Sequence, residues 1–236
     1  METITNYNCK NDASQDVYDA FNSFVFSTDI KIIGKLLYRY NFFNMTMHLP
    51  GDIVEIGVFK GSGVATFQKF IEIFCGRSNK KVLGFDVFNV DAANGILEKD
   101  SENDKKEMNK VFSRVDKSEL DYDVVKKRLE DMNTSQTPVL IKGDVEDTLP
   151  VFLSENPGFR ASLIYIDVDI ERPTYIALKY LWNRLLPGGV VVFDEYEYHT
   201  FSESNGVDKF LKEFDIEYDV KSTLFTCPTA YIIKKK

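Results

Sequence analysis

The spacing of hydrophobic residues changes near residue 50. Before that point, in residues 17–25 and again in residues 32–40, apolar side chains recur every three or four positions. This period predicts two amphipathic helices, the second capped by Thr28, whose apolar faces should pack against the rest of the chain. Residues 1–50 are therefore predicted to form a helical N-terminal segment.

From Asp52 onward the apolar residues form short, nearly continuous runs, each ending in an acid or a glycine and followed by a segment of helical length. The runs span residues 53–56, 82–85, 139–141, 163–166 and 190–193. Such runs, alternating with helices, are typical of a parallel sheet that is covered on both faces. Right-handed crossovers then predict a doubly wound α/β fold. Two β-rich pieces near the end of the chain, residues 223–225 and 231–233, predict an antiparallel hairpin at the sheet edge.

One region is too polar to belong to this pattern. Residues 95–131 contain 20 charged residues among 37. We expect a solvated surface insertion, while a segment that covers the active site remains the alternative. The length of 236 residues suits a single α/β domain with such an insertion.

Composition excludes several classes of function. The formal net charge of −8 disfavours nucleic acid or an anionic membrane as the main partner, because both require a basic face. No apolar run is long enough to span a bilayer. The three cysteines, Cys9, Cys75 and Cys227, form neither a disulfide framework nor a zinc motif, so we expect a reduced, cytoplasmic protein.

The ends of the predicted strands carry the residues with the clearest chemical meaning. Ligands of such sheets bind beyond the carboxyl ends of the strands, where this chain places five acids. They are Glu55, Asp86, Asp144, Asp167 and Asp194. Glycines at positions 57, 61 and 63 predict a tight turn whose backbone N–H groups approach a ligand. Asp86 is expected to accept the hydroxyls of a ribose, although an acid that only caps the next segment is the alternative.

Four carboxylates should converge at two neighbouring strand ends. Asp167 and Asp169 are two residues apart, and Asp194 and Glu195 end the next parallel strand. Carboxylates that share a crevice repel one another, and proteins usually reduce this repulsion by binding a divalent cation such as Mg²⁺ or Mn²⁺. The alternative is that each carboxylate accepts hydrogen bonds from nearby backbone groups. His199, in a tyrosine-rich loop beyond Glu195, is a candidate for contact with substrate.

Five stretches, in order, resemble the S-adenosylmethionine-dependent sugar O-methyltransferases of the macrocin O-methyltransferase family. They are residues 50–61 (PGDIVEIGVFKG), 142–150 (KGDVEDTLP), 166–169 (IDVD), 185–196 (LLPGGVVVFDEY) and 206–210 (GVDKF). The resemblance implies a Rossmann-like class I methyltransferase sheet, mostly parallel with an antiparallel C-terminal strand. It also implies Mg²⁺ or Mn²⁺ on Asp167, Asp194 and Glu195, with Asp169 as the base that deprotonates a sugar hydroxyl. His199 is a second catalytic candidate because of its place in the loop beyond Glu195.

The same resemblance implies S-adenosylmethionine bound along the glycine turn and the following strand ends. The residues expected to hold it are Glu55, Gly57, Val58, Phe59, Lys60, Gly61, Ser62, Asp86, Val87, Gly143, Asp144, Val145 and Asp167. The chain departs from the family at Phe59 and Lys60, where tryptophan and arginine are usual. It departs again at Glu195, where aspartate is usual, and at residues 170–173, where a tyrosine-containing segment is usual.

We therefore predict a metal-dependent O-methyltransferase that acts on a nucleotide-sugar, a glycoside or a polysaccharide unit. A nicotinamide-dependent oxidoreductase is a second hypothesis, disfavoured by the absence of a G-x-G-x-x-G turn and by the acidic cluster. A catalytically silent nucleoside-binding module is a third. The sequence leaves open the acceptor sugar and the oligomeric state, a homo-oligomer included.

Overall fold

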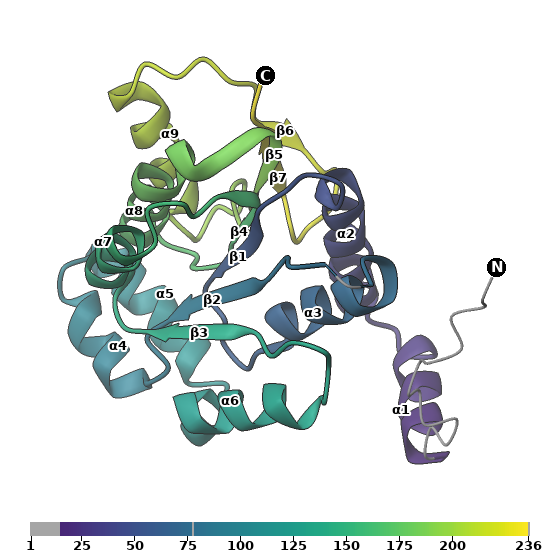
Figure 1. Cartoon of the computed structure of the whole chain (residues 1–236). Coiled ribbons are helices and arrows are strands. Elements are labelled where there is room, and N and C mark those ends of the chain that lie inside the picture. The colour runs from purple at the N-terminus through teal and green to yellow at the C-terminus, as the bar shows by residue number, and fades with distance from the viewer. Residues whose placement is uncertain (1–14, 77, 236) are drawn as a thin grey trace.

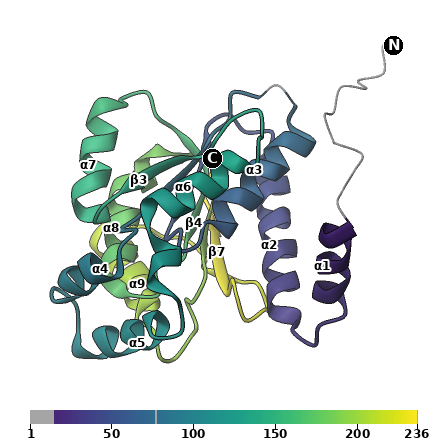
Figure 2. The ribbon, with the colours of Figure 1, turned by 90° about the horizontal axis from the view of Figure 1, so that it is seen from below.

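A seven-stranded sheet with helices on both faces forms the protein (Figures 1 and 2), in a computed structural model that describes residues 15–76 and 78–235. The strands are β1 (Asp52–Ile56), β2 (Val82–Asp86), β3 (Val139–Lys142), β4 (Ala161–Ile166), β5 (Leu185–Phe193), β6 (Lys221–Ser222) and β7 (Ala230–Ile233). The α-helices are α1 (Gln15–Val25), α2 (Ile30–Thr46), α3 (Ser62–Phe74), α4 (Val90–Leu97), α5 (Glu102–Phe112), α6 (Tyr122–Asp131), α7 (Val145–Glu155), α8 (Glu171–Leu181) and α9 (Glu203–Glu213). Two 3₁₀ turns, η1 (Lys117–Leu120) and η2 (Trp182–Arg184), follow α5 and α8. Cys9 and the first 14 residues of the predicted N-terminal segment lie outside the described residues.

The order of the strands confirms the predicted fold class. The sheet runs β3-β2-β1-β4-β5-β7-β6, and the first five strands are parallel to their neighbours. The C-terminal hairpin pairs antiparallel with β5 through β7, as expected, but its first strand ends at Ser222, before the predicted residues 223–225. The direction of winding reverses between β1 and β4, so the crevice for a ligand opens beyond the carboxyl ends of these two strands.

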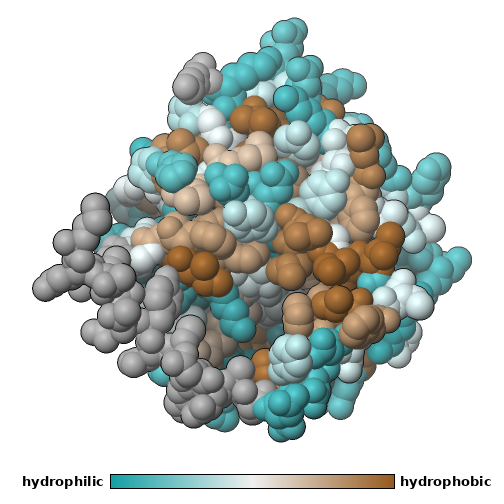
Figure 3. All heavy atoms as spheres, turned by 90° about the vertical axis from the view of Figure 1, so that its right-hand side faces the viewer, coloured by the Kyte–Doolittle hydropathy of each residue, from teal (hydrophilic) through white to brown (hydrophobic). Residues whose placement is uncertain are grey.

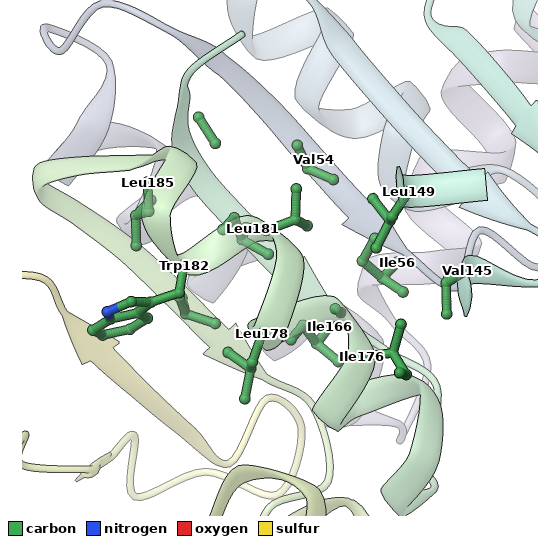
Figure 4. Packing of buried hydrophobic residues seen from close by; sticks show 14 of the residues in the cluster. Val54, Ile56, Val145, Leu149, Ile166, Ile176, Leu178, Leu181, Trp182 and Leu185 are labelled. Atoms are coloured by element: carbon green, nitrogen blue, oxygen red, sulfur yellow. The ribbon is translucent and has the colours of Figure 1, made fainter. Parts of the chain in front are cut away.

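Each face of the sheet has its own hydrophobic core. On one face α7, α8 and α9 pack against the central strands, and Figure 4 shows Leu178, Leu181 and Trp182 of this layer over Val54 and Ile166. On the other face α2, α3 and α6 cover the same strands, with Phe42, Phe43 and Phe67 fully buried. Burial on both faces explains why the strands are continuous apolar runs instead of alternating ones.

The N-terminal helices form where predicted, but their apolar faces do not pack as expected. Asp29 caps α2, accepting a hydrogen bond from the backbone N–H of Lys31 at 2.7 Å, so the prediction of Thr28 as the cap was wrong by one residue. No residue of α1, which lies outside α2 at the edge of the molecule, is buried. Several apolar residues of α2, Leu37 among them, are also exposed, and Figure 3 shows apolar side chains gathering on this side of the molecule. The side of α2 that faces the protein instead carries Arg39 and the two phenylalanines.

The charged region 95–131 is more than a solvated insertion. Its last helix, α6, buries Val125 and Leu129 in the core beside α3. The middle helix, α5, is mostly polar, yet Met108 and Val111 line the central cavity of the protein. The preferred prediction, that residues 95–131 form a surface insertion exposed only to solvent, was therefore wrong. Within the described residues, no helix is long and apolar enough to cross a membrane.

Candidate active site

A cavity of about 870 Å³ opens beyond the carboxyl ends of the parallel strands. Most of the residues predicted to bind the cofactor line it. These are Glu55, Gly57, Val58, Phe59, Ser62, Asp86, Val87, Gly143, Asp144, Val145 and Asp167. Lys60 and Gly61 belong to the same turn but do not line the cavity, and the side chain of Lys60 is exposed.

The glycine turn between β1 and α3 has the backbone conformation that its glycines suggested. Gly57 and Gly61 have φ values of +88° and +91°, which side chains other than glycine rarely adopt. A Cβ atom on Gly57 would also overlap the backbone carbonyl of Asp167 at the end of β4. The turn therefore passes directly against the neighbouring strand end, and the acids of β4 lie beside the proposed cofactor loop.

Asp86 holds this turn in place. Its carboxylate accepts hydrogen bonds from the backbone N–H groups of Val58 and Phe59 at 2.7 and 2.9 Å, and from that of Phe88 at 3.0 Å. The first two bonds share one oxygen and the third uses the other, so the second oxygen keeps capacity for a hydroxyl group. The contact with ribose stays a prediction, and the structure adds a role in ordering the loop.

Asp144 has a partner that the sequence analysis missed. The guanidinium group of Arg172, on α8, lies 3.0 Å from the carboxylate of Asp144 and 2.9 Å from that of Asp100. Arg172 therefore connects the start of α7, at Asp144, with the segment that follows α4, at Asp100. Asp144 also caps α7 through the backbone N–H of Glu146. Arg172 lies in the segment that departs from the family pattern, and that departure was the only signal for it.

The predicted acidic cluster does converge at the ends of β4 and β5. Asp167, Asp169, Asp194 and Glu195 all line the cavity, and Asp194 is only 1% exposed. Both oxygens of Asp194 accept hydrogen bonds: one from the hydroxyl of Tyr165 at 2.5 Å, the other from Lys35 and the thiol of Cys227.

Three cations on one face of α2 meet this cluster, and the sequence analysis did not identify them. The ammonium group of Lys35 lies 2.8 Å from both Asp167 and Asp194. One turn further along α2, the guanidinium of Arg39 lies 2.8 Å from Glu55 and 3.6 Å from Asp167. Lys31, one turn before Lys35, also lines the cavity. Their spacing of four residues places them on one helical face, which is a signal that the sequence contains.

Burial and charge change the proton affinities of these acids. Burial, and then the charge of Asp167, raise the pKa of Asp169 well above its ordinary value. Burial, and then Asp194, raise the pKa of Glu195 to about 7. Burial also disfavours the ionised form of Asp194, but Lys35 and the hydrogen bonds from Cys227 and Tyr165 outweigh it and lower the pKa of this group. Asp169 is therefore a stronger base than Asp194 at the cavity wall.

The donor set differs from the metal site that was predicted. In the described part of the chain, the acidic group with ligand atoms close enough to share an ion is Asp194, Glu195 and Cys227, within 4.8 Å of one another. Asp167, the third predicted ligand, is instead held by Lys35. Mg²⁺ and Mn²⁺ prefer oxygen ligands, and one donor of this group is a thiol. Two of the three predicted ligands, Asp194 and Glu195, belong to this group, and one oxygen of Glu195 is buried without a hydrogen-bond partner among the described residues. The third, Asp167, is engaged by Lys35, so the three predicted acids are not arranged around one ion site.

The loop after β5 contributes to the cavity through residues other than the predicted histidine. Tyr198, Thr200 and Phe201 line the cavity, whereas His199 is exposed and does not. Asn103, the second residue of α5, donates a hydrogen bond to the carbonyl of Thr200 at 3.2 Å, which connects this loop with the helix above the cavity. A substrate contact by His199 has no support from this geometry.

Comparison with known proteins agrees with the resemblance seen in the sequence. The family model of macrocin O-methyltransferase (TylF) matches residues 44–229, well over half of the chain. The structure of the O-methyltransferase NovP is similar to this one with a TM-score of 0.68 at 19% identity, over 85% of this chain and 79% of that one. No curated protein matches.

Two further solved structures share the fold. CalS11, described as a TDP-rhamnose 3′-O-methyltransferase of calicheamicin biosynthesis, has a TM-score of 0.65 at 22% identity and covers 93% of this chain and 85% of its own. An O-methyltransferase from Bacillus cereus in complex with S-adenosylhomocysteine has a TM-score of 0.54 at 14% identity, over 93% and 90% of the two chains. With its class I methyltransferase sheet, this chain belongs to the macrocin O-methyltransferase family and is an S-adenosylmethionine-dependent O-methyltransferase.

Proposed function

We propose that this enzyme transfers the methyl group of S-adenosylmethionine to a hydroxyl group of a sugar, with Asp169 as the general base. The bond between the sulfonium sulfur and the methyl carbon breaks as the new carbon–oxygen bond forms. The sulfur keeps the electron pair, and the hydroxyl proton passes to the carboxylate of Asp169. The products are S-adenosylhomocysteine and the methyl ether.

The observation that carries this proposal is the environment of Asp169. It lies two residues beyond Asp167, faces the same cavity, and has a positive φ of 65° that turns the chain just past the end of β4. Burial raises its pKa, and a base with a raised pKa takes a proton from an alcohol more readily once it is ionised. Asp167 and Asp194 are already engaged with Lys35, so neither has the same freedom to accept a proton.

A nucleotide-linked sugar is the acceptor class that the cavity suits best. Lys110 and Arg114, at the carboxyl end of α5, line the cavity together with the acids. Carboxylates accept hydrogen bonds from sugar hydroxyls, and basic side chains attract phosphate groups. That CalS11 is described as acting on TDP-rhamnose points in the same direction. Glycosides and polysaccharide units remain the other acceptors to test.

The cofactor is proposed to lie along the glycine turn, as the sequence suggested. Asp86 would hold the ribose, Gly57 and Val58 would approach the amino-acid part, and Asp144 would lie near the adenine. The arrangement is supported by the cavity lining, which contains all four residues. The expected cytoplasmic location and a homo-oligomeric state stay predictions.

Replacement of Asp169 tests the proposed base. Asp169→Asn should lower the turnover number by about 10²–10⁴-fold, because the amide cannot accept the hydroxyl proton. The affinity for S-adenosylhomocysteine, measured by calorimetry, should stay within about twofold, since the asparagine keeps the size of the side chain. Asp123→Asn, an exposed change on α6, is the matched control. Retention of more than about a tenth of the turnover, with chemistry rate-limiting, would exclude Asp169 as the base.

A further inference from the structure

We propose that Lys35 takes the place of a divalent cation in this enzyme, so that its ammonium group offsets part of the negative charge of Asp167 and Asp194 and methyl transfer proceeds without metal. The inference rests on the proposed function and deepens it, since it names the group that balances the acids and faces the acceptor hydroxyl. Lys35 is a catalytic residue in this account, because its ammonium group contacts the acceptor hydroxyl, whereas Asp169 remains the base.

The contacts of Lys35 are those expected of a cation shared by two carboxylates. Its Nζ atom lies 2.8 Å from an oxygen of Asp167 and 2.8 Å from an oxygen of Asp194. An ammonium group has three N–H donors, so one remains for a third acceptor. Lys35 lines the cavity, and the oxygen of an acceptor hydroxyl would be such a partner. The ammonium group can therefore reduce the repulsion between the two carboxylates. It can also stabilise the negative charge that develops on the hydroxyl oxygen during methyl transfer.

Two of the three predicted metal ligands, Asp167 and Asp194, already have protein partners for their oxygens, whereas Oε2 of Glu195 is buried with no hydrogen-bond partner among the described residues. Both oxygens of Asp194 accept hydrogen bonds from protein groups, and one of them accepts from Cys227 as well as from Lys35. The carboxylate oxygen of Asp167 that binds Lys35 is also 3.6 Å from the guanidinium of Arg39. A divalent ion would have to displace the ammonium group and approach a second cation, and both steps oppose its binding.

The position of Lys35 is determined by packing, which distinguishes it from a mobile surface lysine. The preceding residue, Gly34, lies so close to the ring of Phe225 that a Cβ atom would overlap it. One turn further along α2, the hydroxyl of Tyr38 donates to the carbonyl of Thr223 at 2.6 Å, and its ring stacks on Phe225. These contacts fix α2 against the loop before β7. The side chain of Lys35 is accordingly only 19% exposed.

Binding of Mn²⁺ tests this inference without any need for substrate. The electron paramagnetic resonance signal of free Mn²⁺ should be unchanged by the wild-type protein and diminished by Lys35→Ala, in which the two carboxylates lose their cation. Lys127→Ala, which removes an exposed lysine of α6, should behave as the wild type. Binding of about one Mn²⁺ per wild-type chain would overturn the inference, as would equal absence of binding in the wild type and Lys35→Ala.

Turnover gives a second and separable readout. The wild type should keep its full rate after treatment with EDTA, whereas Lys35→Ala should lose about 10²-fold or more in turnover number with little change in cofactor affinity. Small primary amines should restore part of that loss, which a merely structural defect would not permit. Loss of wild-type activity in EDTA with recovery in Mg²⁺ would contradict the inference. Failure of every sugar acceptor with the wild type would instead count against the proposed function, and the Mn²⁺ experiment would still decide the role of Lys35.

Discussion

Replacement of Arg39 by methionine should destabilise the protein by an amount that grows with pH. Arg39 and Glu55 are both buried, 7% and 1% exposed, and their charged groups lie 2.8 Å apart. The second oxygen of Glu55 is without a hydrogen-bond partner among the described residues. Methionine keeps much of the apolar stem of the arginine but removes the charged guanidinium, whose central carbon lies 4.8 Å from the centre of the Tyr165 ring.

The direction of the pH dependence follows from the proton affinity of Glu55. Burial raises the pKa of this residue to about 7 in the folded protein, although Arg39 opposes the shift, whereas an ordinary glutamate has a pKa of 4.5. The folded state therefore binds this proton more tightly. The resulting stability is complete below pH 4.5 and declines as the pH rises toward 7. Without Arg39 the pKa rises further, so the decline continues above pH 7.

The magnitude follows from the same numbers. Each pH unit across which Glu55 stays protonated in Arg39→Met but ionised in the wild type costs about 1.4 kcal/mol. The difference in the free energy of unfolding should be small near pH 6, about 1 kcal/mol at pH 8 and roughly 3 kcal/mol at pH 9, which approaches the usual loss for a broken buried ion pair.

Urea unfolding, followed by the fluorescence of the sole tryptophan, Trp182, provides the assay. The double variant Arg39→Met/Glu55→Gln is the control, because it removes both charges and should show little of the pH dependence. A destabilisation that is the same at pH 6 and pH 9, or a double variant as pH-sensitive as Arg39→Met, would refute the reasoning.

Two other changes test how the cofactor loop and α2 are held. Asp86→Ala should weaken S-adenosylhomocysteine binding about tenfold to a hundredfold, because it removes charge-assisted bonds to the loop and to the ribose; unchanged affinity in calorimetry would contradict both roles. Gly34→Ala should lower the melting temperature and the turnover number together, because its Cβ would overlap Phe225 and displace Lys35. Alanine normally favours a helix over glycine by up to about 1 kcal/mol, so a raised melting temperature would show that α2 packs differently.

The sheet and the acids at its edge could be predicted because their signals are local. A strand buried on both faces is a continuous apolar run, and a parallel sheet brings the carboxyl ends of its strands to one edge. The order of the apolar runs was therefore enough to place Asp167 and Asp194 together. The glycine turn could also be predicted from the sequence, because its position requires a residue without a side chain: Gly57 lies directly against the carbonyl of Asp167.

The partners of those acids depend on contacts between distant parts of the chain. Lys35 reaches carboxylates that lie 132 and 159 residues further along the sequence. Apolar periodicity drew attention to the other face of α2, and that face proved to be largely exposed. Similarly, the high charge of residues 95–131 concealed the few apolar side chains of α5, such as Met108, that line the cavity. A search for cations spaced by four residues would have identified the face of α2 that carries Lys35 and Arg39.

Transfer of a labelled methyl group tests the central claim most directly. The wild-type protein, treated with EDTA, is incubated with trideuteromethyl S-adenosylmethionine and a panel of nucleotide-sugars and simple glycosides, and the products are analysed by mass spectrometry. The account predicts that at least one sugar gains one trideuteromethyl group, and that Asp169→Asn forms the same product at a rate lower by about 10²-fold or more. A labelled product that depends on added Mg²⁺, or one that Asp169→Asn forms at the wild-type rate, would contradict it.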